Sequence, residues 1–204
     1  MATRIKKGNR EDAAVRRAQI IDEAIRQIGQ IGSRGFTIQG LASKCGISNA
    51  GLLHYFGSKD GVLIALVDEI ESREEVIVAP LLAATKASSG NGEDAYVAMV
   101  RLLRRIIERY REIPELGRFL IVLQTDAMDP AHPAHAWFLA RAEETEDLFG
   151  QLLAPWAVDA QEAARMCYAL IFGLARRWYD KPESFDLGQT LERAVRAIVP
   201  FESD

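Results

Sequence analysis

The most informative spacing of residue types in the chain lies between Thr37 and Lys59, in the segment TIQGLASKCGISNAGLLHYFGSK. Two short helical stretches meet there at Cys45-Gly46-Ile47-Ser48, which is the spacing of a helix-turn-helix. In the second stretch Leu52 and Phe56 lie four residues apart, so both can pack inward on one face. The outward face is small at its start and rich in hydrogen-bonding groups, and it holds Asn49, Ala50, Leu53, His54 and Tyr55. A helix of this kind can place its N-terminal end in a major groove, which predicts a DNA-reading element.

The junction between the two stretches has the residue types that a tight turn between helices requires. Gly46 can adopt the left-handed backbone conformation without the steric cost of a Cβ atom. Ile47 can fill the space between the helices, and Ser48 is a good N-cap for the second one. We therefore expect two short helices, the second of which presents its start to DNA.

The pattern Thr-x-x-x-Leu-Ala-x-x-x-Gly-Ile-Ser, followed by Gly-x-Leu-x-Tyr-Phe-x-x-Lys, resembles the TetR-type (tetracycline-repressor-like) transcriptional regulators. In this chain it is formed by Thr37, Leu41, Ala42, Gly46, Ile47, Ser48, Gly51, Leu53, Tyr55, Phe56 and Lys59. The resemblance covers the N-terminal third of the chain with high specificity, and the total length and the helical remainder agree with it.

The resemblance also implies which residues contact DNA. Thr37, Tyr55 and Lys59 match phosphate contacts, and Gln39 matches a residue that reaches a base edge or the backbone. The start of the second helix matches the positions that read bases. The complete predicted set is Thr37, Gln39, Ser48, Asn49, Ala50, Gly51, Leu53, His54, Tyr55 and Lys59. Leu53 departs from the family, because many members have tyrosine there and leucine cannot donate a hydrogen bond to a phosphate.

Charge is distributed unevenly along the chain, although the whole protein carries a net charge of -4. Residues 1–60 hold 10 Lys and Arg against 5 Asp and Glu, a charge of +5. Residues 61–204 hold 15 against 24, a charge of -9. A basic front and an acidic back are typical of a protein that contacts phosphate at one end only. Chance scatter of charges is the alternative interpretation.

The hydrophobic periodicity predicts helices and no strands. A first amphipathic helix begins at Ala13, and Ser58 caps a further helix after the DNA-reading segment. Lys86 to Asp94 is the clearest loop. Helical patterns then cover residues 93–111, 115–127, 133–153, 160–180 and 185–199, with prolines between them.

These elements predict an all-α protein with two domains. A flexible basic arm covers residues 1–12, and a three-helix, helix-turn-helix DNA-binding domain follows at residues 13–60. A larger helical domain for effector binding and dimerisation then occupies residues 61–204.

Enzymatic chemistry has little support in the sequence. Asp129, His132 and His135 invite a metal interpretation, but Pro133 favours a helix-entry turn and the spacing matches no firm metal motif. The chain has no glycine-rich phosphate loop, nucleophile elbow or Cys-His pairing. We therefore expect no catalytic residue, no metal and no cofactor, and an all-α enzyme is the weakest functional hypothesis.

Aromatic and polar residues in the second half could form a cavity between helices, where helical bundles commonly bind small molecules. The family resemblance implies such a pocket, whereas plain core packing is the alternative for most of these residues. The pocket candidates are Phe119, Leu123, Gln124, Trp137, Phe138, Tyr168, Phe172 and Arg176.

The last helical pattern carries an apolar stripe of Leu187, Leu191, Ala194, Val195 and Ile198. In TetR-type regulators the last two helices pair with their two-fold mates as a four-helix bundle, so the resemblance implies a dimer interface here. Burial of the stripe within one protomer is the alternative. A homodimer would also read both half-sites of a palindrome, whereas a single recognition helix reads few bases.

The leading hypothesis is a ligand-responsive transcriptional regulator, a repressor that binds a palindromic operator in double-stranded DNA as a homodimer. Its effector is a small molecule. The alternative is a small-molecule-binding protein of the same fold with weak or lost DNA binding, because Leu53, Ala50 and Gly51 offer few polar groups. No apolar segment of a signal peptide is present, and the run from Met166 to Ala175 is too short to cross a bilayer. We expect a cytoplasmic protein with no membrane partner.

Overall fold

The computed structural model describes residues 5–87 and 92–199, and all regular structure in these two ranges is helical. The helices are α1 (Ile5–Gly35), α2 (Ile38–Lys44), α3 (Asn49–Phe56), α4 (Lys59–Ala87), α5 (Gly92–Glu112), α6 (Pro114–Asp126), α7 (His135–Leu153), α8 (Ala160–Asp180) and α9 (Leu187–Ile198). The predicted all-α class is confirmed. Within the same ranges, no helix combines the length and the apolar content that crossing a bilayer would require.

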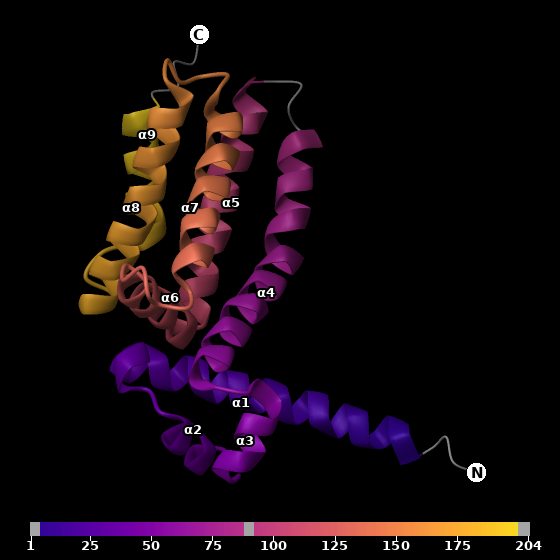
Figure 1. The fold of residues 1–204 in the computed structure, drawn as a ribbon. Helices are drawn as coiled ribbons and strands as arrows, with labels where there is room; N and C mark the ends of the chain where they lie inside the picture. Colours follow the sequence, from indigo (N-terminus) through magenta and orange to yellow (C-terminus); the bar gives the residue numbers. More distant parts are fainter. Residues whose placement is uncertain (1–4, 88–91, 200–204) are drawn as a thin grey trace.

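The three N-terminal helices form one end of the molecule, and α4 leads from them towards the remaining helices (Figure 1). The helices α5, α7, α8 and α9 form a bundle on the other side of α6, which packs along α1. Gly29 allows this close packing, because a Cβ atom there would lie only 3.3 Å from the backbone oxygen of Glu115. We refer to the end formed by α1, α2 and α3 as the DNA-reading end. The short helix α6 therefore lies between the DNA-reading end and the bundle.

Side-chain caps fix where several helices begin. An oxygen of the residue before α2, α3, α8 and α9 accepts a backbone N–H of the first helical turn, which would otherwise have no partner. These caps are Thr37, Ser48, Asp159 and Asp186. Helix α6 instead begins with Pro114, whose missing N–H costs nothing in the first turn.

The buried apolar residues form two clusters, and the division between them does not fall at residue 60. The first cluster joins α1, α2 and α3 with the first half of α4, with α6 and with the start of α7. The second joins α5, the end of α7, α8 and α9. Because α4 runs from Lys59 to Ala87, the expected boundary at residues 60 and 61 lies inside one helix. The DNA-reading helices therefore share a core with the helices α4 and α6.

Several helix boundaries differ from the expectations. The expected arm over residues 1–12 is helical from Ile5 onward, and residues 1–4 lie outside the described ranges. Helix α4 continues through Pro80 to Ala87, so it enters the expected loop at Lys86, while the centre of that loop lies outside the described residues. Helix α7 begins at His135, two residues after the expected start.

Candidate nucleic-acid interface and central cavity

The caps of the helix-turn-helix leave two hydroxyl groups at the surface. Thr37 Oγ1 accepts the N–H of Gly40 and Ser48 Oγ accepts the N–H of Gly51, each at 3.0 Å, which confirms Ser48 as the N-cap of α3. A hydroxyl that accepts one bond can still donate its own hydrogen. Both residues are exposed, so each can donate to a phosphate oxygen near the positive end of its helix.

The turn between α2 and α3 has the expected geometry. Gly46 has φ 66°, in the left-handed region, as its position between two helices predicted. Its N–H donates to the backbone oxygen of Ser43 at 3.2 Å, and the N–H of Ile47 donates to that of Ala42 at 3.0 Å. Ile47 packs against the first core cluster, so backbone hydrogen bonds and apolar packing together hold the turn in place.

Helix α3 has one buried face and one exposed face. Leu52 is fully buried and Phe56 is 9% exposed, which confirms the predicted inward pair. The other predicted DNA contacts on this helix are distributed over its surface: Asn49, Ala50, Leu53 and His54 are exposed, whereas Gly51 and Tyr55 are half-buried. On the preceding helix Gln39 is also exposed. The structure therefore brings the predicted residues to one end of the molecule.

Two cations lie over aromatic rings of this end. Lys59 Nζ is 5.9 Å from the centre of the Phe36 ring, and the guanidinium carbon of Arg17 is 5.4 Å from the centre of the Phe56 ring. Such cation–π contacts hold a flexible cation in place at modest energy. Arg17 was missed at the sequence level, because the positive charge of the N-terminal part does not tell which arginine of α1 faces α3.

The three residues that invited a metal interpretation have other partners. His132 Nε2 lies 3.2 Å from Ser33 Oγ, and His135 Nδ1 lies 2.7 Å from the backbone oxygen of Ala127. Asp129 Oδ1 accepts the N–H of Ala131 at 3.0 Å. No group of three or more His, Cys, Asp or Glu in the described ranges is arranged to hold a metal ion.

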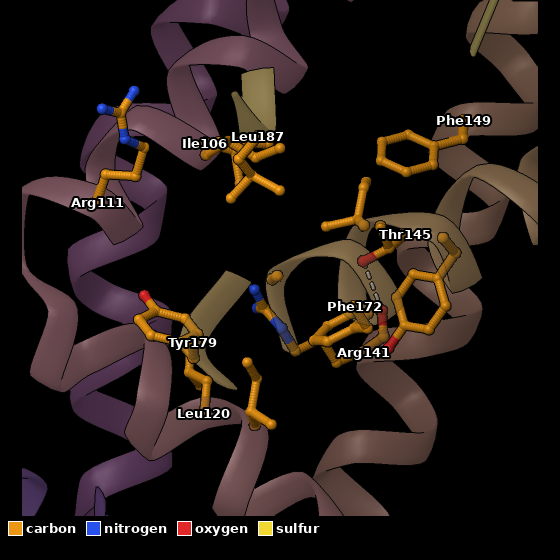
Figure 2. Close-up of a pocket in the computed structure, with 15 residues that line it drawn as sticks. Ile106, Arg111, Leu120, Arg141, Thr145, Phe149, Phe172, Tyr179 and Leu187 are labelled. Atoms are coloured by element: carbon orange, nitrogen blue, oxygen red, sulfur yellow. Dashed lines mark hydrogen bonds between the residues drawn. The ribbon is translucent and has the colours of Figure 1, made fainter. Parts of the chain in front are cut away.

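A central cavity of about 90 Å³ lies among the helices α5 to α9. Tyr179 and Leu120 lie on one side of it and Phe149 and Thr145 on the other (Figure 2). Its polar lining consists of Arg111, Arg141, Thr145, Tyr168 and Tyr179, and the remaining lining residues are apolar. Burial raises the pKa of Tyr179 to about 12 and also raises the pKa of Tyr168, so both phenols stay protonated at neutral pH.

Only two of the eight predicted pocket residues line this cavity, Tyr168 and Phe172. Gln124 lies behind the lining and donates to the Tyr168 hydroxyl at 3.4 Å. The other apolar candidates belong to the first core cluster or pack against it; they are Phe119, Leu123, Trp137 and Phe138. Arg176 lines a separate, more open cavity of about 530 Å³ beside Gly29, Asp126 and Asp180. The four apolar candidates were placed in the pocket because an apolar helix face looks the same in sequence whether it meets another helix or a gap.

Comparison with known proteins agrees with the helix-turn-helix geometry. Residues 20–66 match the family described as bacterial regulatory proteins, tetR family. The HTH-type transcriptional regulator BetI of Burkholderia thailandensis is 30% identical over 189 residues, which cover 88% of this chain and 90% of that relative. This chain belongs to the TetR family.

Other TetR-family proteins show how far the likeness extends. The HTH-type transcriptional regulator TtgR of Pseudomonas putida is 27% identical over 203 residues, covering 91% of this chain and 90% of the relative. The structure of NalD, the secondary repressor of the MexAB-OprM multidrug efflux pump in Pseudomonas aeruginosa, has 17% identity and a TM-score of 0.70, covering 92% of this chain and 95% of NalD. Reduced E. coli NemR has 15% identity and a TM-score of 0.71, covering 93% and 99%. The TetR-family fold thus covers nearly the whole chain, which is a DNA-binding transcriptional regulator.

The apolar stripe of α9 is covered within this TetR-family protomer. Leu187, Leu191 and Val195 are at most 2% exposed and pack in the second core cluster with residues of α5 and α8. This corrects the expected dimer contact at these three positions, because an amphipathic stripe does not reveal which helix covers it. Ala194 and Ile198 are half-buried and remain partly accessible.

A polar contact joins the DNA-reading end of the TetR-family fold to α6. Ser33 is 1% exposed, and both its N–H and its hydroxyl donate to Asp126 Oδ2 at 2.7 Å. The preceding Gly32 has φ 74°, which turns the chain at this point. Helix α6 also supplies Leu120 and Ile121 to the central cavity. It therefore connects the cavity with α1 through the Ser33–Asp126 contact.

Proposed function

We propose that this TetR-family regulator is a repressor that binds a palindromic operator as a homodimer, with α3 of each protomer in a major groove. The exposed, capped start of α3 carries this proposal, because Asn49 and Ala50 project from a helix whose other face is fixed in the core. In this proposal residues 13–60 read DNA, and the chain from residue 61 onward binds the effector and dimerises. Such a regulator acts in the cytoplasm, where bacterial DNA lies.

The hydrogen-bonding groups of each side chain indicate which part of the DNA it contacts. The Thr37 hydroxyl and the Lys59 ammonium donate to phosphates, and Asn49 reads a base edge. Leu53 is 39% exposed and can contact a thymine methyl group where other members have a polar side chain. The remaining contact surface consists of Gln39, Ser48, Ala50, Gly51, His54 and Tyr55.

Salt-dependent DNA binding tests this function. Lys59→Ala should weaken binding to all duplexes alike and reduce the slope of log K against log salt by about one unit, because one phosphate contact is lost. Arg105→Ala is the matched control, since Arg105 is an exposed cation of α5 that pairs with Glu108 at 3.2 Å. An unchanged slope in Lys59→Ala, measured by fluorescence anisotropy, would contradict the assignment.

The dimer interface is proposed on the exposed face of α8 together with the adjoining side of α9. Met166 is 46% exposed, and Ala169 and Gly173 are exposed on the same helix. Ala197 is exposed on α9, next to the half-buried Ala194 and Ile198. Small and apolar residues on two adjacent helices allow close approach of the two-fold mates, as in a four-helix bundle.

Substitution of Gly173 tests this interface without disturbing the core. A Cβ atom at Gly173 would meet nothing within 4 Å, and arginine favours a helix more than glycine does, so Gly173→Arg should fold. Its long charged side chain should prevent pairing, whereas Gly173→Ala should remain dimeric. Sedimentation that shows Gly173→Arg to be dimeric at micromolar concentration would exclude this face.

The effector is proposed to bind in the central cavity. At about 90 Å³ the cavity is far smaller than the roughly 300–1,000 Å³ of typical ligand pockets, so an effector of ordinary size requires the surrounding helices to move apart. Binding and conformational change are then coupled. A coupling of about 1–3 kcal/mol would change operator affinity some 5- to 150-fold, and the operator would weaken effector binding by the same factor.

A further inference from the structure

Most polar groups of the central cavity can donate a hydrogen bond into it. Arg111 and Arg141 contribute guanidinium groups, and Tyr168 and Tyr179 contribute hydroxyls. The hydroxyl of Thr145 is already used, because it donates to the backbone oxygen of Arg141 at 2.7 Å. Among the described residues that line the cavity there is no Asp or Glu. Gln124 donates to the Tyr168 oxygen, so the Tyr168 hydroxyl hydrogen is directed elsewhere. A space with apolar walls, positive charge and hydroxyl donors favours an anion with an apolar body.

Arg141 connects this cavity to α4. Its guanidinium group lines the cavity and also pairs with the carboxylate of Glu74, across 67 positions of the chain. The side chains of Arg141 and Glu74 are only 28% and 13% exposed, so water screens the pair weakly. The Trp137 ring lies 5.1 Å from the guanidinium carbon and keeps it in place. Arg111, by contrast, lies exposed at the rim with its guanidinium group directed away from Tyr179 (Figure 2).

We propose that the effector is a carboxylate with an aromatic or aliphatic body, whose carboxylate group binds Arg141 in competition with Glu74. The proposal rests on the proposed function, since it names the effector class of the same cavity. Guanidinium binds carboxylate in a two-pronged geometry, so an incoming carboxylate can replace that of Glu74 group for group.

The competition explains how binding could reach the DNA-reading end. The neighbour of Glu74, Arg73, donates to Asp22 of α1 at 2.8 Å and to Glu69 at 2.9 Å. Helix α4 begins at Lys59, with two residues between it and the end of α3, so it extends from the DNA-reading end to Glu74, the partner of the cavity residue Arg141. Loss of the Arg141–Glu74 pair releases α4 from α7 at this level.

Matched pairs of probes test the charge requirement. Benzoate, phenylbutyrate and decanoate are compared with their primary amides by titration calorimetry on the full chain, and operator affinity is measured in parallel. We expect at least one carboxylate to bind about 10- to 100-fold more tightly than its amide, the range that charge-assisted hydrogen bonds give. Arg141→Gln should abolish the difference, and Arg141→Lys should retain part of it.

Glu74→Gln provides the sharper readout, because misfolding cannot produce a gain of affinity. Removal of the competing carboxylate should raise the affinity of the carboxylate probe several-fold and leave that of its amide unchanged. Glu71→Gln is the matched control: Glu71 lies one turn away on α4 and accepts from the Trp137 indole at 3.4 Å, and this change should have no such effect.

The outcomes separate this proposal from the proposed function. Amides that bind as tightly as carboxylates, a preference that survives Arg141→Gln, or no binding by any probe at millimolar concentration would each overturn it. Amides that bind equally and release DNA would overturn it while leaving a ligand-responsive regulator. Carboxylates that bind as predicted without changing operator affinity would support this site and contradict induction.

Discussion

Removal of the Asp126 carboxylate should destabilise the protein and weaken the connection between α1 and α6. Ser33 is almost fully buried, and its N–H and hydroxyl both donate to Asp126 Oδ2 at 2.7 Å. Because the chain turns at Gly32, with φ 74°, the Ser33 N–H points across to α6. The carboxylate thus satisfies a buried backbone donor at the junction between the DNA-reading end and the cavity.

The magnitude follows from what each group loses in Asp126→Ala. The buried Ser33 N–H keeps no acceptor. The Ser33 hydroxyl cannot donate to His132 instead, because His132 Nδ1 accepts the N–H of Ala134 at 3.2 Å, so Nε2 carries the hydrogen of the neutral ring. An unsatisfied buried donor costs about 1–3 kcal/mol, so we expect the free energy of unfolding to fall by roughly 2–3 kcal/mol. Asp126→Asn keeps an acceptor oxygen and should cost about 1 kcal/mol.

Urea unfolding with linear extrapolation measures the difference. Asp129→Ala is the control, because Asp129 is exposed and pairs with exposed Arg34 at 3.6 Å, a contact that contributes about 0–1 kcal/mol. If Asp126→Ala costs no more than Asp129→Ala, the buried contact does not stabilise the junction and the reasoning is refuted. Effector-induced loss of operator affinity should also be smaller in Asp126→Ala, since α6 would be less firmly joined to α1.

Two further predictions concern pH and base reading. Burial lowers the pKa of His132 below 6.5, although the charges of Asp126, Asp129 and Asp60 act to raise it. The neutral ring therefore contributes stability that is fully present above pH 6.5, the unfolded pKa. This stability is lost as the pH falls through the lower pKa of His132 in the folded protein. His132→Gln should therefore show a smaller loss of stability between about pH 7 and about pH 5 than the wild type, and equal losses would exclude this role. Asn49→Ala should cost about 1–3 kcal/mol at one position of each half-site, measured with a set of singly substituted operators, and a uniform loss across all positions would assign Asn49 to the backbone instead.

Most helices could be predicted from the sequence, because amphipathic periodicity and prolines act locally. The pattern over 160–180 corresponds to Ala160–Asp180, and that over 115–127 corresponds to Pro114–Asp126. The turn at Gly46 and the inward pair Leu52 and Phe56 were predictable for the same reason. The length of α4 was not, since a proline usually ends a helix, whereas α4 continues through Pro80.

Properties that depend on contacts between distant helices could not be predicted in the same way. Leu191 gives the same stripe whether α5 or a second protomer covers it, and only the packed structure shows that it is core. Phe119 and Tyr168 are both aromatic residues on helices, but only Tyr168 faces the gap. Arg141 was missed because its partner Glu74 lies far away in the sequence.

Selection of bound duplex DNA from a random pool tests the central claim most directly, because the protein itself then chooses the operator sequence. A dimer that reads DNA through two copies of α3 should enrich an inverted repeat whose half-site centres lie about 34–36 Å apart, or a multiple of that spacing. The motif should disappear from the pool when Gly173→Arg replaces the wild-type protein. No enriched motif, or a single half-site without a repeat, would contradict the account of a dimeric operator-binding regulator.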